Sequence, residues 1–142
     1  MNSVCIEGGC LCGAVRFRVR SEPGIVLNCH CIDCRRATGA PFVTWAVFPR
    51  QAVEWSGPAA RRVPWADRLR LSCPQCGSPL GILPTEQADI VVLAAGTMDR
   101  PEGMVPACDV WTQDHLPWVP LATNLPHHVA GLTVESAEPA RA

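Results

Sequence analysis

Three cysteines within six consecutive residues are the part of this chain best suited to chemistry. Cys29, Cys31 and Cys34 lie close together, and two arginines follow them. Side chains two positions apart on an extended segment point to the same face, so the thiols of Cys29 and Cys31 can reach one ion. Cys34 follows at a spacing with which a tight turn or a first helical turn adds a third sulfur. We therefore expect these three thiolates to form a metal site.

The number of ligands in this set indicates a site that is open to substrate. Structural zinc sites usually have four protein ligands, whereas catalytic zinc sites commonly have three and leave the fourth tetrahedral position to water or substrate. His30 lies between the first two cysteines, and on an extended segment it should point away from both of them. The sequence therefore predicts a catalytic zinc at Cys29, Cys31 and Cys34.

A second set of four cysteines is divided between two distant parts of the chain. Cys10 and Cys12 form a CxC motif ahead of an expected strand, and Cys73 and Cys76 form a CxxC motif. Gly77 follows the CxxC and can adopt the positive φ that a zinc-knuckle turn often needs. Four thiolates complete a tetrahedron, so we expect a structural zinc that ties the N-terminal strand to the middle of the chain.

Other roles for the nine cysteines stay open at this stage. In a chain without a signal-peptide pattern, cysteines are more often metal-bound or reactive than disulfide-bonded, because the cytosol keeps thiols reduced. A CxxC pair can also be a redox pair, and this alternative applies to Cys31 with Cys34 and to the motif that begins at Cys73. Cys5 and Cys108 remain, and the simplest interpretation of each is a small core residue, which we favour for Cys5.

The composition limits both the chemistry and the partners. All twelve basic residues are arginine, so lysine Schiff-base chemistry and a P-loop are excluded. Tyrosine is absent, which leaves His, Cys, Asp and Glu for proton transfer. The formal net charge of −1 gives no reason to expect nucleic acid or an anionic membrane as partner. No stretch approaches the roughly 18 apolar residues of a membrane span, and we expect a cytosolic protein.

The elements that position the cysteines should be short strands, because fourteen prolines and eleven glycines are spread through the chain. Residues 14–20 alternate, with Val15, Phe17 and Val19 toward a core and arginines toward solvent, which indicates a half-buried strand. Further strands are expected at 25–27, 42–48, 52–55, 68–71 and 90–95, and one or two helical turns at 32–38. The length favours one zinc-binding domain, residues 1–134, with a disordered tail at 135–142.

Taken together, these motifs resemble the glutathione-dependent formaldehyde-activating enzyme family, which also includes centromere-protein-V-like proteins. The resemblance is carried, in matching order and spacing, by Gly8–Phe17, Cys29–Gly39 and Cys73–Leu80, with weaker matches at Gly96–Asp99. It covers nearly the whole chain. One position departs from the family pattern, since relatives often carry a histidine in the place of Cys108.

The resemblance implies a fold, two metal sites and an activity. The implied fold is mainly β, a β-tent of small antiparallel sheets with a structural zinc and few short helices, similar to methionine sulfoxide reductase B. The implied sites are a structural zinc at Cys10, Cys12, Cys73 and Cys76 and a catalytic zinc at Cys29, Cys31 and Cys34. The implied activity is a carbon–sulfur lyase acting on a glutathione or similar thiol adduct, such as S-hydroxymethylglutathione.

Charge near the open site indicates how a thiol substrate would be held. Zinc with three thiolates carries a formal charge of −1, which a substrate thiolate would raise to −2. Arg35 and Arg36 follow the third cysteine and could neutralise this charge or bind a carboxylate of a thiol such as glutathione. Candidates for proton delivery are a water near the metal, His30 and His115. Asp33 is as well placed to cap the short helix as to act as a base.

Two other functions compete with the lyase. A non-catalytic zinc module would bind a thiol or a protein partner without turnover, and a redox protein would cycle Cys31 and Cys34 through a disulfide. Trp111, Trp118 and Phe42 are candidates for walls of the pocket at the open zinc site, although such aromatic residues are more often core.

Overall fold

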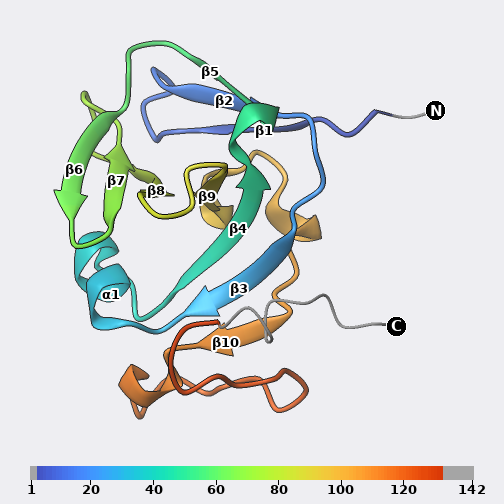
Figure 1. The fold of residues 1–142 in the computed structure, drawn as a ribbon, viewed down its shortest axis with the longest axis vertical. Coiled ribbons are helices and arrows are strands. Elements are labelled where there is room, and N and C mark those ends of the chain that lie inside the picture. The colour runs from blue at the N-terminus through green and yellow to red at the C-terminus, as the bar shows by residue number, and fades with distance from the viewer. Residues whose placement is uncertain (1–2, 133–142) are drawn as a thin grey trace.

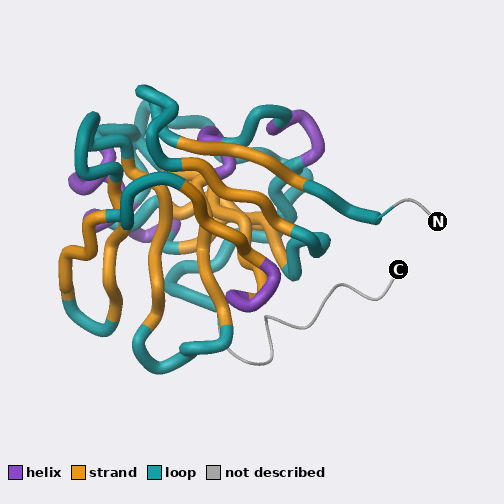
Figure 2. The backbone as a smooth tube through the Cα atoms, turned by 90° about the horizontal axis from the view of Figure 1, so that it is seen from above, coloured by secondary structure: helices purple, strands orange, loops and turns teal. Residues whose placement is uncertain are grey.

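A computed structural model describes residues 3–132 of the chain, so the expected tail at 135–142 lies outside the described residues. The fold is mainly β, as the family resemblance implied. Residues 3–132 form ten strands, one α-helix of seven residues, α1 (Ile32–Thr38), and four short 3-10 turns. Figure 2 shows the strands running beside one another, with the short helical segments at the periphery. Within the described part of the chain, no helix is both long and apolar enough to cross a membrane.

The strands form two sheets (Figure 1). The smaller one is antiparallel, in the order β1 (Ile6–Gly9), β2 (Arg16–Val19) and β5 (Val53–Ser56). The larger one has the order β10 (Cys108–Val110), β3 (Ile25–Cys29), β4 (Val43–Pro49), β9 (Ile90–Ala94), β8 (Pro79–Pro84), β7 (Arg68–Ser72) and β6 (Arg61–Trp65). Neighbours in it are antiparallel except β10, which runs parallel to β3, so the larger sheet is mixed.

One face of the larger sheet packs against the smaller sheet and forms the main core. Successive side chains of a strand alternate between faces, and β2 follows this rule. Val15, Phe17 and Val19 are at most 2% exposed, whereas Arg18 lies in solvent. They pack in one apolar cluster with residues of the larger sheet that include Phe48 of β4. The predicted alternation of residues 14–20 is therefore confirmed.

The other face of the larger sheet carries a second apolar cluster, and this cluster leads to chemistry. Trp45, Ile82 and Val110 are buried there together with Cys29 and Cys34. The cysteines thus come from the end of β3 and from α1, where the helix meets the sheet. One face of the larger sheet therefore contributes to the main core, and the other face contributes to the cluster that contains the thiols.

The predicted elements correspond closely to observed ones. The helix has the predicted bounds and ends at Gly39, whose φ is +77°. Each predicted strand is present, with ends that differ by at most two residues. Strands β1, β6, β8 and β10 were not predicted, and they include both edge strands of the larger sheet.

Candidate metal centres

Four cysteines from distant parts of the sequence come together beside the smaller sheet. The sulfur atoms of Cys10, Cys12, Cys73 and Cys76 all lie within 4.8 Å of one another. Cys12 Sγ is 3.5 Å from Cys10 Sγ and 3.8 Å from Cys73 Sγ. This is the set that the spacing of the motifs predicted for a structural zinc, and its four thiols can hold a metal ion.

Backbone N–H groups in two tight turns point at these sulfurs. The Val15 N–H donates to Cys10 Sγ over 3.3 Å, and the Cys76 N–H donates to Cys73 Sγ over 3.4 Å. Gly77 adopts φ +76°, and its N–H donates to the Cys73 carbonyl over 3.0 Å. Donors aimed at sulfur favour the thiolate form, which is the form that binds metals.

Ser78 links the two halves of this cluster. Its Oγ accepts a hydrogen bond of 2.9 Å from the Leu11 N–H and lies 3.1 Å from Cys76 Sγ. Because the oxygen accepts from Leu11, its hydroxyl proton is free to donate to the sulfur. Hydrogen bonds to the Ser78 side chain and backbone lower the pKa of Cys76 to about 5. The Ser78 side chain therefore joins the CxC turn to the CxxC turn and favours the thiolate form of Cys76.

The second cluster lies where β3 passes into α1. The sulfur atoms of Cys29, Cys31 and Cys34 lie within 4.8 Å of one another, and within residues 3–132 no fourth Cys, His, Asp or Glu completes this group. Cys29 is 6% exposed and Cys34 is 1% exposed. Cys31 is the N-cap of the helix, since its Sγ accepts from the Cys34 N–H over 3.2 Å. The helix cap that was considered for Asp33 is therefore made by a cysteine, and Asp33 is exposed in the first turn.

Two N–H donors of the larger sheet face this cluster. Arg70 Nη2 lies 3.6 Å from Cys34 Sγ, and the buried Trp45 Nε1 makes no hydrogen bond of normal geometry. The pKa of Cys34 is lowered by hydrogen bonds from the thiols of Cys29 and Cys31, and then by Arg70 and Trp45, against the effect of burial. A cationic donor and an unpartnered indole N–H beside three thiols suit a site that carries negative charge. A soft, thiophilic ion such as zinc fits this donor set.

Arg70 is a site residue that the sequence reasoning missed. The alternation at 68–71 placed Arg68 and Arg70 on one face of a strand, but it did not show which face this was. The pairing of Arg70 with Ile82 places the guanidinium on the face that holds the thiols. Only the strand register reveals the contact.

The two arginines predicted from the sequence to bind substrate are placed differently. Arg35 is half-buried, and its Nη1 donates to the Asp114 carbonyl over 3.1 Å, which ties α1 to the segment after β10. Arg36 is exposed on the helix. Their role in substrate binding stays a prediction.

A buried polar pair, His30 and Asp109, lies where β3 ends. His30 Nε2 is 2.9 Å from Asp109 Oδ1, and the two residues are 1% and 2% exposed. The His30 ring packs on Phe42 with centroids 5.0 Å apart. Asp109 also accepts from the His128 N–H over 2.8 Å and donates its N–H to the Pro126 carbonyl over 3.0 Å. The pair therefore joins the last described segment to the strand end that carries Cys29.

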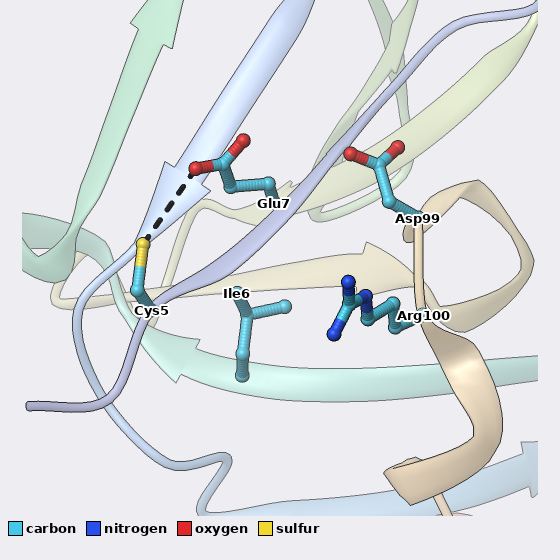
Figure 3. Close-up of a pocket in the computed structure, with 5 residues that line it drawn as sticks. All are labelled: Cys5, Ile6, Glu7, Asp99 and Arg100. Atoms are coloured by element: carbon cyan, nitrogen blue, oxygen red, sulfur yellow. Dashed lines mark hydrogen bonds between the residues drawn. The ribbon is translucent and has the colours of Figure 1, made fainter. Parts of the chain in front are cut away.

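The two remaining cysteines lie in different surroundings. Cys108 is 3% exposed beside Leu27, and burial raises its pKa. Cys5 is exposed, so the core interpretation favoured for it is wrong, because it precedes an edge strand of the smaller sheet. Its Sγ lies 3.8 Å from Glu7 Oε1, in a separate pocket of about 480 Å³ (Figure 3).

A pocket of about 260 Å³ opens beside the three-cysteine cluster, with Cys29 and Cys34 in its wall. Trp111 and Arg68 line it and also line a smaller pocket of about 180 Å³, in which Cys31 and Asp33 lie. The expectation that Trp111 forms a pocket wall is therefore confirmed. Trp118, by contrast, is 69% exposed.

Comparison with known proteins agrees with this geometry. A family model described as glutathione-dependent formaldehyde-activating enzyme matches residues 5–114. An uncharacterized lyase of Schizosaccharomyces pombe is 27% identical over 74 residues, which cover 52% of this chain and 54% of the relative, so the match spans about half the length of that protein. A solved structure of a Rhodobacter sphaeroides protein is similar in fold, with a TM-score of 0.56 and 22% identity, over 70% of this chain and 91% of that one.

Proposed function

This chain belongs to the glutathione-dependent formaldehyde-activating enzyme family, and we propose that it is a zinc-dependent carbon–sulfur lyase. Its substrate would be the adduct of a small thiol with formaldehyde, of which S-hydroxymethylglutathione is the example that the family name supplies. The observation that carries the proposal is the cluster of Cys29, Cys31 and Cys34, which has three thiols in reach of one ion and a pocket beside them. The name of the Schizosaccharomyces pombe relative supports the reaction class.

The two clusters would have different tasks. Cys10, Cys12, Cys73 and Cys76 would hold a structural zinc, since four thiolates fill its coordination sphere. Cys29, Cys31 and Cys34 would hold the second zinc, which would keep a substrate sulfur in its thiolate form at neutral pH. All nine cysteines are free thiols, which suits the reducing cytosol that we propose as the compartment.

The reaction is the reversible addition of a thiol to the carbonyl group of formaldehyde. In the synthetic direction the substrate sulfur forms a bond to the carbonyl carbon, the π pair of the C=O bond moves to oxygen, and the oxygen takes a proton. In the lyase direction the hydroxyl loses its proton and the carbon–sulfur bond breaks. Arg70, 3.6 Å from Cys34 Sγ, would offset the negative charge that a fourth thiolate adds to the site.

His115 is the better of the two histidine candidates for the proton. Its Nδ1 lies 2.8 Å from the Thr112 carbonyl, and a carbonyl only accepts, so Nδ1 carries the hydrogen and Nε2 is left for proton exchange. His115 also follows Asp114, which lines the smaller pocket. His30 is occupied by Asp109 and is almost fully buried.

The test is turnover measured against a blank, because formaldehyde also adds to thiols without a catalyst. Exchange between a thiol, ¹³C-formaldehyde and their adduct would be followed by NMR, for glutathione and for butanethiol, with the zinc-loaded protein, with its Cys31→Ser variant and with no protein. We expect the wild type to accelerate exchange at least about 100-fold, the lower end of the range for general acid–base catalysis by a positioned side chain, and the variant to match the blank.

Three other outcomes would reject the lyase. Equal rates for wild type and blank, with glutathione bound, would favour the non-catalytic zinc module. Equal rates with no bound thiol would remove the substrate class as well. Reversible formation of a Cys31–Cys34 disulfide with release of zinc would favour the redox protein.

A further inference from the structure

Three apolar side chains of the larger sheet, Val47, Val92 and Ile82, line the pocket beside the three-cysteine cluster. Val47 of β4 is paired with Val92 of β9, and Val92 is paired with Ile82 of β8. These three strands are neighbours in the larger sheet (Figure 1). Paired residues project from the same face, so the three side chains form a continuous row. All three line the pocket that has Cys29 and Cys34 in its wall.

The two charged residues of this pocket pair with each other and stay partly exposed, and Gln87 adds a neutral amide to the lining. Arg68 and Asp67 are the charged side chains in its lining, and Arg68 Nη2 lies 3.1 Å from Asp67 Oδ1. Arg70, in the same face, is directed at Cys34. Glutathione carries two carboxylates and an ammonium group besides its thiol. Placing such charges against an apolar floor without partners is costly, so this pocket is poorly suited to the body of a peptide thiol.

Trp111 forms another part of the wall of this pocket. Its backbone lies in the left-handed region, with φ +56° and ψ +41°. Its backbone N–H donates to the Ala130 carbonyl over 3.1 Å. A non-glycine residue in this region costs free energy and persists only where its surroundings hold it. Its indole packs on Gly131, where an added Cβ would lie 3.4 Å from Trp111 Nε1. A strained backbone and a glycine together fix an aromatic ring beside the pocket.

We propose that the thiol substrate of this protein carries an apolar group, aliphatic or aryl, which lies between Trp111 and the row formed by Val47, Val92 and Ile82 while its sulfur reaches the three-cysteine site. This inference rests on the proposed function and deepens it by naming the substrate class. The volume of about 260 Å³ is slightly below the range of about 300–1,000 Å³ typical of small-molecule sites. It suits a compact apolar group.

The experiment is isothermal titration calorimetry of the zinc-loaded protein with ethanethiol, propanethiol, butanethiol and glutathione. Each methylene buried in the pocket should tighten binding about fourfold, and butanethiol should bind at least tenfold more tightly than glutathione. Val92→Thr, which keeps the shape and replaces one methyl group with a hydroxyl, should reduce the gain per methylene to about twofold or less. Val47→Phe, which fills the pocket, should abolish it. Val63→Thr is the matched control on β6, where Val63 is 41% exposed.

The outcomes separate this inference from the proposed function. Glutathione binding more tightly than butanethiol, or equal gains per methylene in wild type and both pocket variants, would overturn the apolar pocket. The lyase would survive that result if the glutathione adduct were still turned over. Gains that depend on Val92 and Val47, without accelerated exchange of any thiol adduct, would establish the pocket as a binding site and reject the lyase.

Discussion

Arg70 Nη2 lies 3.6 Å from Cys34 Sγ, although the two residues are 36 positions apart and belong to different elements. The arginine comes from β7 and the cysteine from α1, so the contact joins the helix to the larger sheet. Arg70 is partly buried, so its charge keeps some contact with solvent and is desolvated only in part. A cation supplied by the sheet thus faces the thiol cluster.

Replacing this cation should weaken the three-cysteine site. Arg70→Met keeps an apolar stem of similar length and removes the charge. We expect zinc affinity at this site to fall by about 10–100-fold, as for other residues that support metal ligands. Competition with a chromophoric chelator would measure it. Arg62→Met on the exposed strand β6 is the matched control, and equal affinities in the two variants would exclude a role for Arg70.

Removing single thiols should separate the two metal centres. Native mass spectrometry of freshly purified, reduced protein should find two zinc ions in the wild type and one in Cys31→Ser. Cys73→Ser should lose the other ion and several kcal/mol of folding free energy, because structural zinc contributes directly to folding. Cys5→Ser, at an exposed thiol, should change neither count nor stability. A single zinc in both the wild type and Cys31→Ser would mean that only the four-cysteine site is filled.

The two groups of cysteines that could each hold a metal ion were predictable because cysteine spacing encodes them locally. CxC and CxxC motifs place sulfurs on one face or one turn, whatever fold surrounds them. Gly39 and Gly77 adopt the positive φ that such turns need. Ligand counting divided the cysteines into four and three, the family resemblance implied the same division, and the structure gathers the same two groups.

The surroundings of the sites were not predictable, since they depend on register between distant strands. Strand β6 contains Pro64 and is exposed along its whole length, so it shows no hydrophobic alternation. Strand β10 has only three residues, all buried, and its parallel pairing with β3 brings Asp109 to His30. No local pattern marks Trp45 or Arg70 as neighbours of Cys34.

Acid should remove one surface ion pair in a predictable window. Arg16 Nη1 donates to Asp99 Oδ1 over 2.9 Å, and hydrogen bonding to Arg16 lowers the pKa of Asp99 from 3.8. A depressed pKa contributes stability above the unfolded value and loses it as pH falls through the folded one. Urea midpoints should therefore be lower for Asp99→Asn at neutral pH and should converge with the wild type well below pH 3.8. The difference should shrink in high salt, because the pair is exposed.

A stability difference between Asp99→Asn and the wild type that persists in acid would contradict this account. Glu22→Gln is the control.

The buried pair of His30 and Asp109 should be strongly coupled. Nε2 of His30 and Oδ1 of Asp109 are 2.9 Å apart at positions that are at most 2% exposed. Removing His30 therefore leaves the buried carboxylate with only the more distant His127 Nε2, 3.6 Å from Asp109 Oδ2. We expect His30→Leu to cost about 3 kcal/mol of unfolding free energy, as for other broken buried pairs. The double variant His30→Leu, Asp109→Leu should cost less than the sum of the single variants, by about 1–3 kcal/mol. Urea unfolding at fixed free zinc would measure the cycle, and strictly additive costs would show that the two side chains stabilise the fold independently.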